Sequence, residues 1–265
     1  MTDALEASLA ALAPLTIAVS GGVDSMTLAV FAHRRLGADA VAMAHAVSPA
    51  VPPEATGRVQ DWARREGWRL TLLDAGEFAD PAYRANPVNR CFYCKTHLYS
   101  AIAARTAGQV VSGANTDDLG EYRPGLTAAA DHGVRHPYLE AGMDKAAVRA
   151  LARRLDLGDL AELPAAPCLS SRIETAIAID PAMLAAVHQV ERLLTAELAP
   201  RAVRCRVRRL GVVIELDPAS LAALGEDARA RFGADIAALL PADLATCPIA
   251  FEAYRNGSAF LRESA

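Results

Sequence analysis

Two cysteines three positions apart are the residues of this chain whose types and spacing most directly suggest chemistry. Cys91 and Cys94 lie in the stretch NRCFYCK, and the whole chain has five cysteines. A Cys-x-x-Cys pair is typical of a redox dithiol, of half a zinc site or of part of an iron–sulfur site. No second Cys-x-x-Cys occurs in the sequence, so a metal bound here would need ligands from elsewhere in the chain.

The hexapeptide SGGVDS, residues 20–25, is a second stretch that could do chemistry. Gly21 and Gly22 allow a tight turn that aims backbone N–H groups at an anion, and the hydroxyls of Ser20 and Ser25 add donors. A helix that follows the turn contributes the positive end of its dipole. The stretch lacks the lysine of a Walker A loop and the spacing of a dinucleotide fingerprint. It predicts an anion site, with an ordinary glycine turn as the alternative.

Polar residues follow a later apolar run in the stretch GANTDD. Asn115, Asp117 and Asp118 could hold Mg²⁺ or a nucleotide, because carboxylate and amide oxygens are ligands that Mg²⁺ prefers. From spacing alone, an Asx-rich turn that caps the next helical segment is an equal alternative.

Arginines alternate in the stretch RCRVRR. In a strand, Arg204, Arg206 and Arg208 would share one face, which suits a phosphate or carboxylates on a substrate. A solvated surface strand is the alternative. Arg172, four residues after Cys168, is expected to contact groups near the chemistry. The six histidines show no ligand spacing and are interpreted as structural or surface residues.

Hydrophobic periodicity predicts the elements that position these residues. Strands are expected at Thr16–Val19 and in AVAMAHAVS, WRLTLLDAG and QVVSGANTDD; helices are expected at Met26–Leu36, in PEATGRVQDWARREG and at Lys95–Gly108. This alternation predicts a parallel sheet with helices on both faces. Ligands of such sheets bind at the carboxyl ends of the strands, where Ser20, Ser48 and Gly113 fall.

The alternation stops at AELPAAPCLSSRIE, which has two prolines and no periodicity and is interpreted as a domain junction. The junction is followed by a helix in PAMLAAVHQVERLLTAEL and by paired strands in AVRCRVRRLGVVIEL. The last stretch, PASLAALGEDARARFGADIAALL, is expected to be helical. We therefore expect an α/β domain over residues 1–170 and a smaller α+β domain over residues 176–265.

Composition narrows the class of protein. A net charge of −4 argues against nucleic-acid binding, which needs a basic surface. No apolar run is long enough to span a membrane, and the N-terminus has no basic start and is read as a helix rather than a signal peptide. We expect a cytoplasmic protein, in which cysteines serve as ligands, nucleophiles or packing residues.

Taken together, these motifs resemble a known family. SGGVDS resembles the PP-loop of ATP pyrophosphatases, and NPVNRCFYCK, GANTDDLGEYRPG and PAAPCLSSR resemble the LarE family of ATP-dependent sulfur transferases. The likeness covers most of the first 175 residues and weakens towards the C-terminus. It implies an adenine nucleotide alpha hydrolase-like first domain and ATP cleavage to AMP and pyrophosphate. The implied substrate is a pyridinium dicarboxylate mononucleotide, of which one carboxylate is adenylylated and converted to a thiocarboxylate.

The resemblance also implies roles for individual residues. Asp24 would position Mg²⁺ and pyrophosphate, and Cys168 and Arg172 would act with it in catalysis. ATP would be bound by a set drawn from the turn and the later loop: Ser20, Gly21, Gly22, Asp24, Ser25, Asn115 and Asp117. The second domain would bind the substrate through Arg206, Arg208, Glu191 and Arg255, and members of this family tend to form homo-oligomers.

Two branches of the LarE family differ in their source of sulfur. In one branch the cysteine that corresponds to Cys168 is sacrificial and loses its sulfur by β-elimination. The sequence resembles the other branch more closely, in which three cysteines hold a [4Fe-4S] cluster with one iron open to an exogenous sulfide. Cys91, Cys94 and Cys168 match that set of three.

Other interpretations of the cysteine pair remain open. Zinc would need a further ligand, which Cys205 or His97 could supply. A thioredoxin-like dithiol would lie at a helix N-terminus after a first strand, whereas this pair follows a full nucleotide-binding unit. Inert buried thiols fit poorly with the polar neighbours Arg90 and Lys95. Cys205, like Cys247, has no partner motif and is interpreted as packing.

Three rival functions are weighed against sulfur transfer to a small molecule. A tRNA thiolase shares the PP-loop and a three-cysteine cluster but needs an RNA-binding surface, which the acidic charge balance does not favour. A PP-loop amide ligase would leave the three cysteines without a role. A non-catalytic nucleotide sensor would leave the arginine strand unexplained.

Overall fold

The computed structural model describes residues 2–120 and 122–261, and the chain divides into two compact units. The first unit consists of Met1–Ala79 and Asn89–Ala166. The second consists of Asp80–Val88 and Pro167–Ala265.

The short segment Asp80–Val88 belongs to the second unit, although the predicted boundaries include it in the first domain. The buried side chain of Asn86 accounts for this placement. Its amide group donates hydrogen bonds to the carbonyl groups of Glu174 (2.9 Å) and Ile177 (3.0 Å). One asparagine thus ties this segment to a loop that lies about ninety residues later in the chain.

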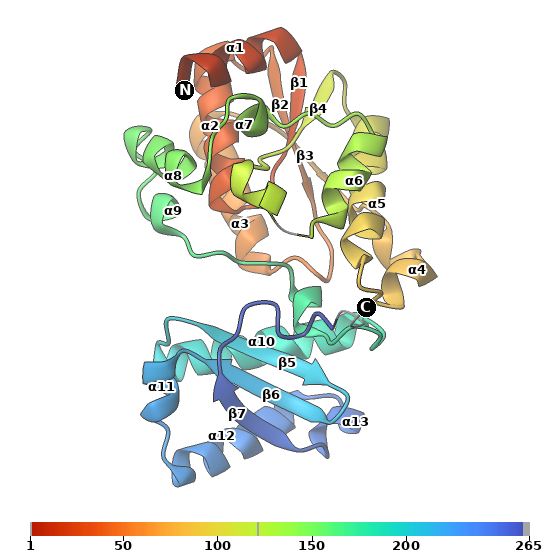
Figure 1. The fold of residues 1–265 in the computed structure, drawn as a ribbon, viewed down its shortest axis with the longest axis vertical. Helices are drawn as coiled ribbons and strands as arrows, with labels where there is room; N and C mark the ends of the chain where they lie inside the picture. The colour runs from red at the N-terminus through yellow and green to blue at the C-terminus, as the bar shows by residue number, and fades with distance from the viewer. Residues whose placement is uncertain (1, 121, 262–265) are drawn as a thin grey trace. The chain divides into compact units, whose positions relative to one another are not determined.

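The first unit is built on a sheet of four parallel strands (Figure 1). Its spatial order is β3-β2-β1-β4, and the strands are β1 (Leu15–Ala18), β2 (Val41–Ala46), β3 (Arg69–Leu73) and β4 (Gln109–Val111). The pairing β1–β2, β2–β3 and β1–β4 is parallel throughout. The predicted α/β class with a parallel sheet of the PP-loop type is therefore confirmed.

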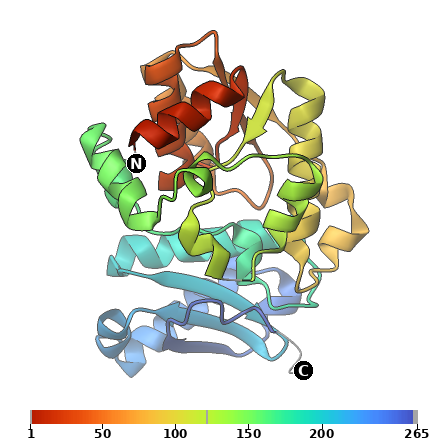
Figure 2. The same cartoon turned by 45° about the horizontal axis from the view of Figure 1, so that its top comes forward.

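Helices cover both faces of this sheet (Figures 1 and 2). They are α1 (Thr2–Leu12), α2 (Val23–Leu36), α3 (Pro53–Glu66), α5 (Arg90–Arg105), α6 (Pro124–Asp131), α7 (Pro137–Glu140), α8 (Lys145–Arg154) and α9 (Asp159–Glu162). Alternate residues of β1 divide between the two faces, as a pleated strand requires. Leu15 and Ile17 join the core under α1, α2, α3 and α8, whereas Ala18 packs into the core formed with α5 and α6.

The second unit contains a three-stranded sheet with the order β5-β6-β7. Its elements are α4 (Pro81–Arg84), α10 (Pro181–Leu198), β5 (Val203–Arg208), β6 (Gly211–Leu216), α11 (Pro218–Ala222), α12 (Glu226–Leu239), α13 (Ala242–Ala245) and β7 (Ile249–Ala253). The paired strands β5 and β6 and the helical stretches that contain α10, α11 and α12 were predicted from the sequence, whereas the short helices α4 and α13 were not. Strand β7 was not predicted either. It pairs in parallel with β6, and its residues are at most half-buried, so its hydrophobic pattern is weak.

Among the helices that the structure describes, we find none with the length and apolar character that a membrane crossing requires.

Candidate functional site

The SGGVDS turn joins β1 to α2 at the carboxyl edge of the parallel sheet. The Ser20 N–H donates a hydrogen bond to Ser25 Oγ (3.0 Å), and the two serine hydroxyl oxygens lie 3.1 Å apart. Gly21 has a φ of +80°, and a Cβ at this position would lie 2.7 Å from the carbonyl oxygen of Ala55. Only glycine fits there, because both the backbone angle and the neighbouring chain exclude a side chain.

The first turn of α2 is open to an anion. Gly22 is the N-cap residue, and no side chain caps the N–H groups that follow it. These N–H groups carry the positive end of the helix dipole. The turn therefore has the geometry that phosphate binding needs.

The carboxylate of Asp24, the second residue of α2, accepts hydrogen bonds from two distant parts of the chain. Its Oδ2 lies 2.5 Å from Lys145 Nζ, and its Oδ1 accepts a hydrogen bond from Asn115 Nδ2 at 3.4 Å. The hydroxyl of Tyr138 donates to the Asp24 carbonyl at 3.2 Å. The structure thus brings together Asp24 and Asn115, which the sequence analysis selected, and adds Lys145, which it missed.

The loop after β4 packs closely against the start of α2. A Cβ on Gly113 would lie 3.0 Å from the backbone nitrogen of Ser25. Asn115 is buried; its Oδ1 accepts the N–H of Asp117 (3.1 Å), while its own N–H donates to Asp118 Oδ2 (3.0 Å). The Asx turn that was weighed as an alternative is therefore formed, and the same Asn115 also reaches Asp24.

Two histidines, the buried His45 and the half-buried His136, support this edge of the sheet. His45 lies with its ring nitrogens 2.8 Å from the Val19 carbonyl oxygen and 2.9 Å from Thr56 Oγ1, and burial lowers its pKa. His136 Nδ1 lies 2.9 Å from Ser112 Oγ, and burial lowers its pKa as well. Both fix loops that follow strands, which agrees with the structural role predicted for the histidines.

The cysteine pair lies in the first turns of α5, because this helix begins at Arg90 and not at Lys95 as predicted. Cys91 and Cys94 are three positions apart on that helix and so share one face; both are half-buried. The start was missed because Asn89 makes no side-chain capping bond and the first turn contains aromatic residues. The argument that set aside a thioredoxin-like dithiol by its position is therefore weakened, since the pair does lie at a helix N-terminus.

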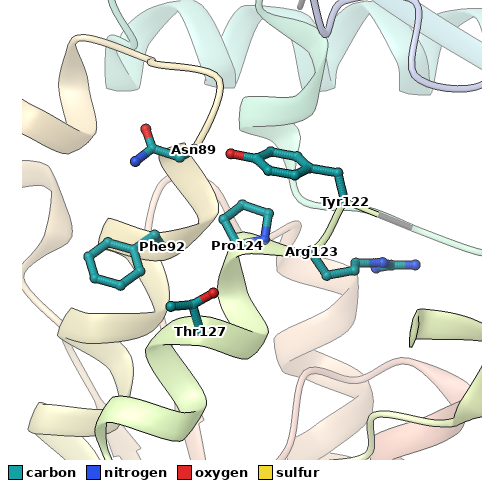
Figure 3. A pocket seen from close by; sticks show the side chains of 6 residues that line it. All are labelled: Asn89, Phe92, Tyr122, Arg123, Pro124 and Thr127. Atoms are coloured by element: carbon teal, nitrogen blue, oxygen red, sulfur yellow. The ribbon is translucent and has the colours of Figure 1, made fainter. Parts of the chain in front are cut away.

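A pocket of about 340 Å³ opens beside the cysteine pair, between the starts of α5 and α6 (Figure 3). Its lining residues are Asn89, Phe92, Tyr122, Arg123, Pro124 and Thr127. Two aromatic side chains and one guanidinium group give it a mixed apolar and cationic wall. The sequence analysis did not identify this pocket.

In the second unit, Cys168 is the N-cap residue of a short 3-10 turn, η3 (Leu169–Arg172). Arg172 is buried and holds this turn: its Nη1 donates to the carbonyl oxygens of Pro167 (2.8 Å) and Cys168 (3.3 Å). Its Nε and Nη2 donate to the two carboxylate oxygens of Glu191, each at 2.9 Å. Burial lowers the pKa of Arg172, but the hydrogen bonds and charge of Glu191 outweigh it and raise the pKa above its usual value. Arg172 and Glu191 therefore form a buried ion pair that holds the backbone of the turn at Cys168.

The alternating arginines of β5 share the face opposite the helices, and a buried carboxylate lies among them. Glu215 of β6 accepts hydrogen bonds from Arg206 Nε and Arg208 Nη2, each at 2.9 Å. Arg206 Nη1 also donates to the carbonyl of Ser171 in η3 (3.0 Å). Arg255, the last of the selected residues, is exposed and lies 3.6 Å from Glu252. The sequence analysis missed Glu215.

Cys205 lies on the opposite face of β5 and is fully buried. Burial raises the pKa of its thiol well above the usual range, and its N–H donates to Glu191 (2.9 Å). These facts agree with the packing role predicted for it and do not favour it as a zinc ligand. Within residues 2–120 and 122–261, no group of three or more histidine, cysteine, aspartate or glutamate side chains is gathered so that it could hold a metal ion.

No family model matches the chain, but known proteins are similar to it in sequence. The uncharacterized protein slr1717 of Synechocystis is 38% identical over 215 residues, which are 80% of this chain and 79% of that protein. The pyridinium-3,5-bisthiocarboxylic acid mononucleotide synthase of Lactiplantibacillus plantarum is 31% identical over 157 residues. That match covers 58% of this chain and 57% of the synthase, which is less than two thirds of its length.

Proposed function

We propose that this chain is a LarE-like sulfur transferase, which adenylylates a carboxylate of a pyridinium dicarboxylate mononucleotide and converts that carboxylate to a thiocarboxylate. The observation that carries the proposal is the meeting of the SGGVDS turn, Asp24 and Asn115 at one edge of the sheet. A site for ATP phosphates and a site for Mg²⁺ would there share a carboxylate.

The first step is a transfer of AMP. A substrate carboxylate oxygen forms a bond to the α-phosphorus of ATP, the α–β bond breaks, and pyrophosphate leaves with the electron pair. The residues needed are those that neutralise charge on the leaving group. The open N–H groups of α2 and the serine hydroxyls of the turn would serve the phosphates.

The carboxylate of Asp24 is the group at this site that would bind Mg²⁺. Mg²⁺ is bound through one or two carboxylates together with substrate phosphates, and keeps several waters. The side chain of Asp24 is 29% exposed, so its carboxylate is accessible to such an ion, while the Asn115 amide nitrogen donates a hydrogen bond to it. When bound, the ion would neutralise charge on the β- and γ-phosphates.

The second step delivers sulfur, and we propose Cys91, Cys94 and Cys168 as ligands of a [4Fe-4S] cluster. Each of these three cysteines is partly exposed, in contrast to the buried Cys205, and thiolates are the usual ligands of such a cluster. Such a cluster, when bound, leaves one iron open to a sulfide. Arg172 donates a hydrogen bond to the carbonyl of Cys168, so it fixes the backbone from which this thiol projects. Sacrificial donation of sulfur from Cys168, without a cluster, is the alternative.

Substrate charge favours the arginine face of the second unit as the binding surface. The guanidinium groups of Arg204, Arg208 and Arg255 are at least partly exposed here, whereas Arg206 is buried and its charge is balanced by Glu215. Because positive charge is in excess, this face suits a phosphate with carboxylates. The buried Glu191 would act through Arg172 on the same surface.

Anaerobic turnover tests the proposal. The protein, purified without oxygen, is analysed for iron and sulfide and then incubated with Mg²⁺, ATP, sulfide and the pyridinium dicarboxylate mononucleotide. We expect pyrophosphate release that depends on the substrate, and a product heavier by the exchange of oxygen for sulfur. Pyrophosphate release without any sulfur in the product would contradict sulfur transfer and favour an amide ligase or a nucleotide sensor.

A further inference from the structure

The pocket between the starts of α5 and α6 has walls that suit a flat aromatic ring (Figure 3). Phe92 comes from α5, whereas Tyr122 and Pro124 come from the segment that leads into α6. Tyr122 is 50% exposed, so a ligand can reach its ring from solvent. The volume of about 340 Å³ is at the lower end of the range for small-molecule sites, about 300–1,000 Å³. The pocket therefore suits one ring rather than a whole nucleotide.

The two helices that bear the pocket are packed closely at Gly125, the second residue of α6. A Cβ at Gly125 would lie 3.1 Å from Lys95 Cγ and 3.8 Å from the carbonyl oxygen of Cys91. A larger residue would therefore have to displace α6 from α5 or shift the lysine side chain. This close packing holds the aromatic wall at a fixed place beside Cys91.

Arg123 lies at the rim of the pocket, and its side chain extends away from Phe92 (Figure 3). Its Nη2 lies 2.8 Å from Asp118 Oδ1, and Asp118 Oδ2 accepts the N–H of Asn115 at 3.0 Å. Asn115 in turn donates to Asp24, the proposed magnesium ligand, at 3.4 Å. Consecutive polar contacts within the first unit thus join the rim of the pocket to the edge where a substrate carboxylate must meet ATP.

We propose that this pocket binds the pyridinium ring of the substrate and that Arg123 binds one of the carboxylates on that ring. This inference rests on the proposed function, and it adds the ring to the phosphate contacts proposed for the second unit. The synthase of Lactiplantibacillus plantarum is named for a pyridinium ring with two thiocarboxylic acid groups.

The charges of such a ring match both parts of the pocket. A positively charged ring is attracted to the faces of aromatic side chains, here those of Phe92 and Tyr122. Its two carboxylates outweigh the positive charge of the ring, so a cation at the rim attracts them. A guanidinium group matches the fork of a carboxylate, and the Arg123 side chain is 47% exposed, so a carboxylate can reach it. Arg123 therefore orients a carboxylate towards the ATP edge and takes no part in bond making.

Calorimetry on the full chain tests the inference with three ligands: the pyridinium dicarboxylate mononucleotide, nicotinamide mononucleotide and magnesium ATP. Nicotinamide mononucleotide has a pyridinium ring with an amide group and no carboxylate. Tyr122→Leu should weaken binding of both mononucleotides by about twofold to thirtyfold, the effect of one cation–π contact. Tyr122→Phe, which keeps the ring, should bind them as wild type does. Both variants should keep their affinity for ATP within about twofold of wild type.

Arg123→Gln separates the contribution of the carboxylate from that of the ring. It should weaken binding of the dicarboxylate by about threefold to tenfold, a modest effect because the guanidinium group is half exposed. Its affinity for nicotinamide mononucleotide should stay within about twofold of wild type. Arg105→Gln, a change of an exposed arginine at the other end of α5, is the matched control and should leave every affinity unchanged.

Several outcomes would overturn the inference. Equal losses of ATP and dicarboxylate affinity in Tyr122→Leu would show an adenine site or a structural effect. Unchanged dicarboxylate affinity in both Tyr122→Leu and Arg123→Gln would place the ring elsewhere. Equal losses for the two mononucleotides in Arg123→Gln would show that Arg123 binds no carboxylate. If wild type binds magnesium ATP but not the dicarboxylate, the proposed function itself is wrong, and this inference is wrong with it.

Discussion

Replacing Glu191 by alanine should destabilise the second unit strongly, because the change leaves a buried guanidinium group without its partner. The side chains of Arg172 and Glu191 are only 5% and 11% exposed, and two hydrogen bonds of 2.9 Å join them. Removing one member of a buried ion pair costs about 3–5 kcal/mol. Glu191→Ala also leaves the buried N–H of Cys205 without its acceptor, a loss of about 1–3 kcal/mol on its own. The two contributions share one carboxylate, so we expect about 4–5 kcal/mol in total.

Replacing both partners by apolar residues should behave differently. A well-packed apolar pair is often as stable as the buried ion pair that it replaces. We therefore expect the double variant Arg172→Met, Glu191→Leu to recover most of the stability lost by Glu191→Ala. Its sulfur transfer should remain low, because the hydrogen bond from Arg172 to the Cys168 carbonyl is gone.

Urea denaturation, followed by circular dichroism, measures both effects, and product mass measures sulfur transfer. A loss below about 1 kcal/mol for Glu191→Ala would refute the reasoning, since such a value belongs to exposed ion pairs. Full sulfur transfer by the stable double variant would show that Arg172 does not position Cys168.

Three further outcomes are expected. Asp24→Asn should abolish pyrophosphate release with the fold intact, as measured by a pyrophosphate assay and circular dichroism; release at the wild-type rate would contradict the magnesium role. Arg208→Gln should weaken binding of the phosphate-bearing substrate more than binding of ATP, measured by calorimetry; equal losses would assign this face to ATP or to folding. Alanine at Cys91, Cys94 or Cys168 should each lower bound iron and sulfide-dependent activity in parallel. Loss of activity only at Cys168, with an H₂S mass loss from wild type, would instead support the sacrificial route.

Much of the first unit could be predicted because its signals are local. Apolar runs and the glycines of the SGGVDS turn predict a strand, a tight turn and a helix within about twenty residues, and the structure has them in that order. Ends of helices are less readable. The start of α5 was missed, since the side chain of Asn89 makes no capping bond there.

Ion pairs between distant residues could not be predicted from local pattern. Asp24 and Lys145 are 121 positions apart, and no periodicity connects them. The scarcity of lysine was the available signal, because composition is visible without a structure. The burial of Glu215 was harder still to predict. Its sequence signal is a single glutamate within the apolar run GVVIEL, and the pairing of β5 with β6 is what shows this side chain to be buried among arginines.

The two ion pairs of the candidate site differ in exposure, and that difference decides what each can do. Asp24 and Lys145 are about one third exposed, so water and ligands compete for both charges. Arg172 and Glu191 are almost fully buried, so separating them would strand a charge in the interior. The first pair suits the ATP step, in which metal and phosphate must enter and leave. The second suits the proposed sulfur step, because it would hold the backbone at Cys168 in place.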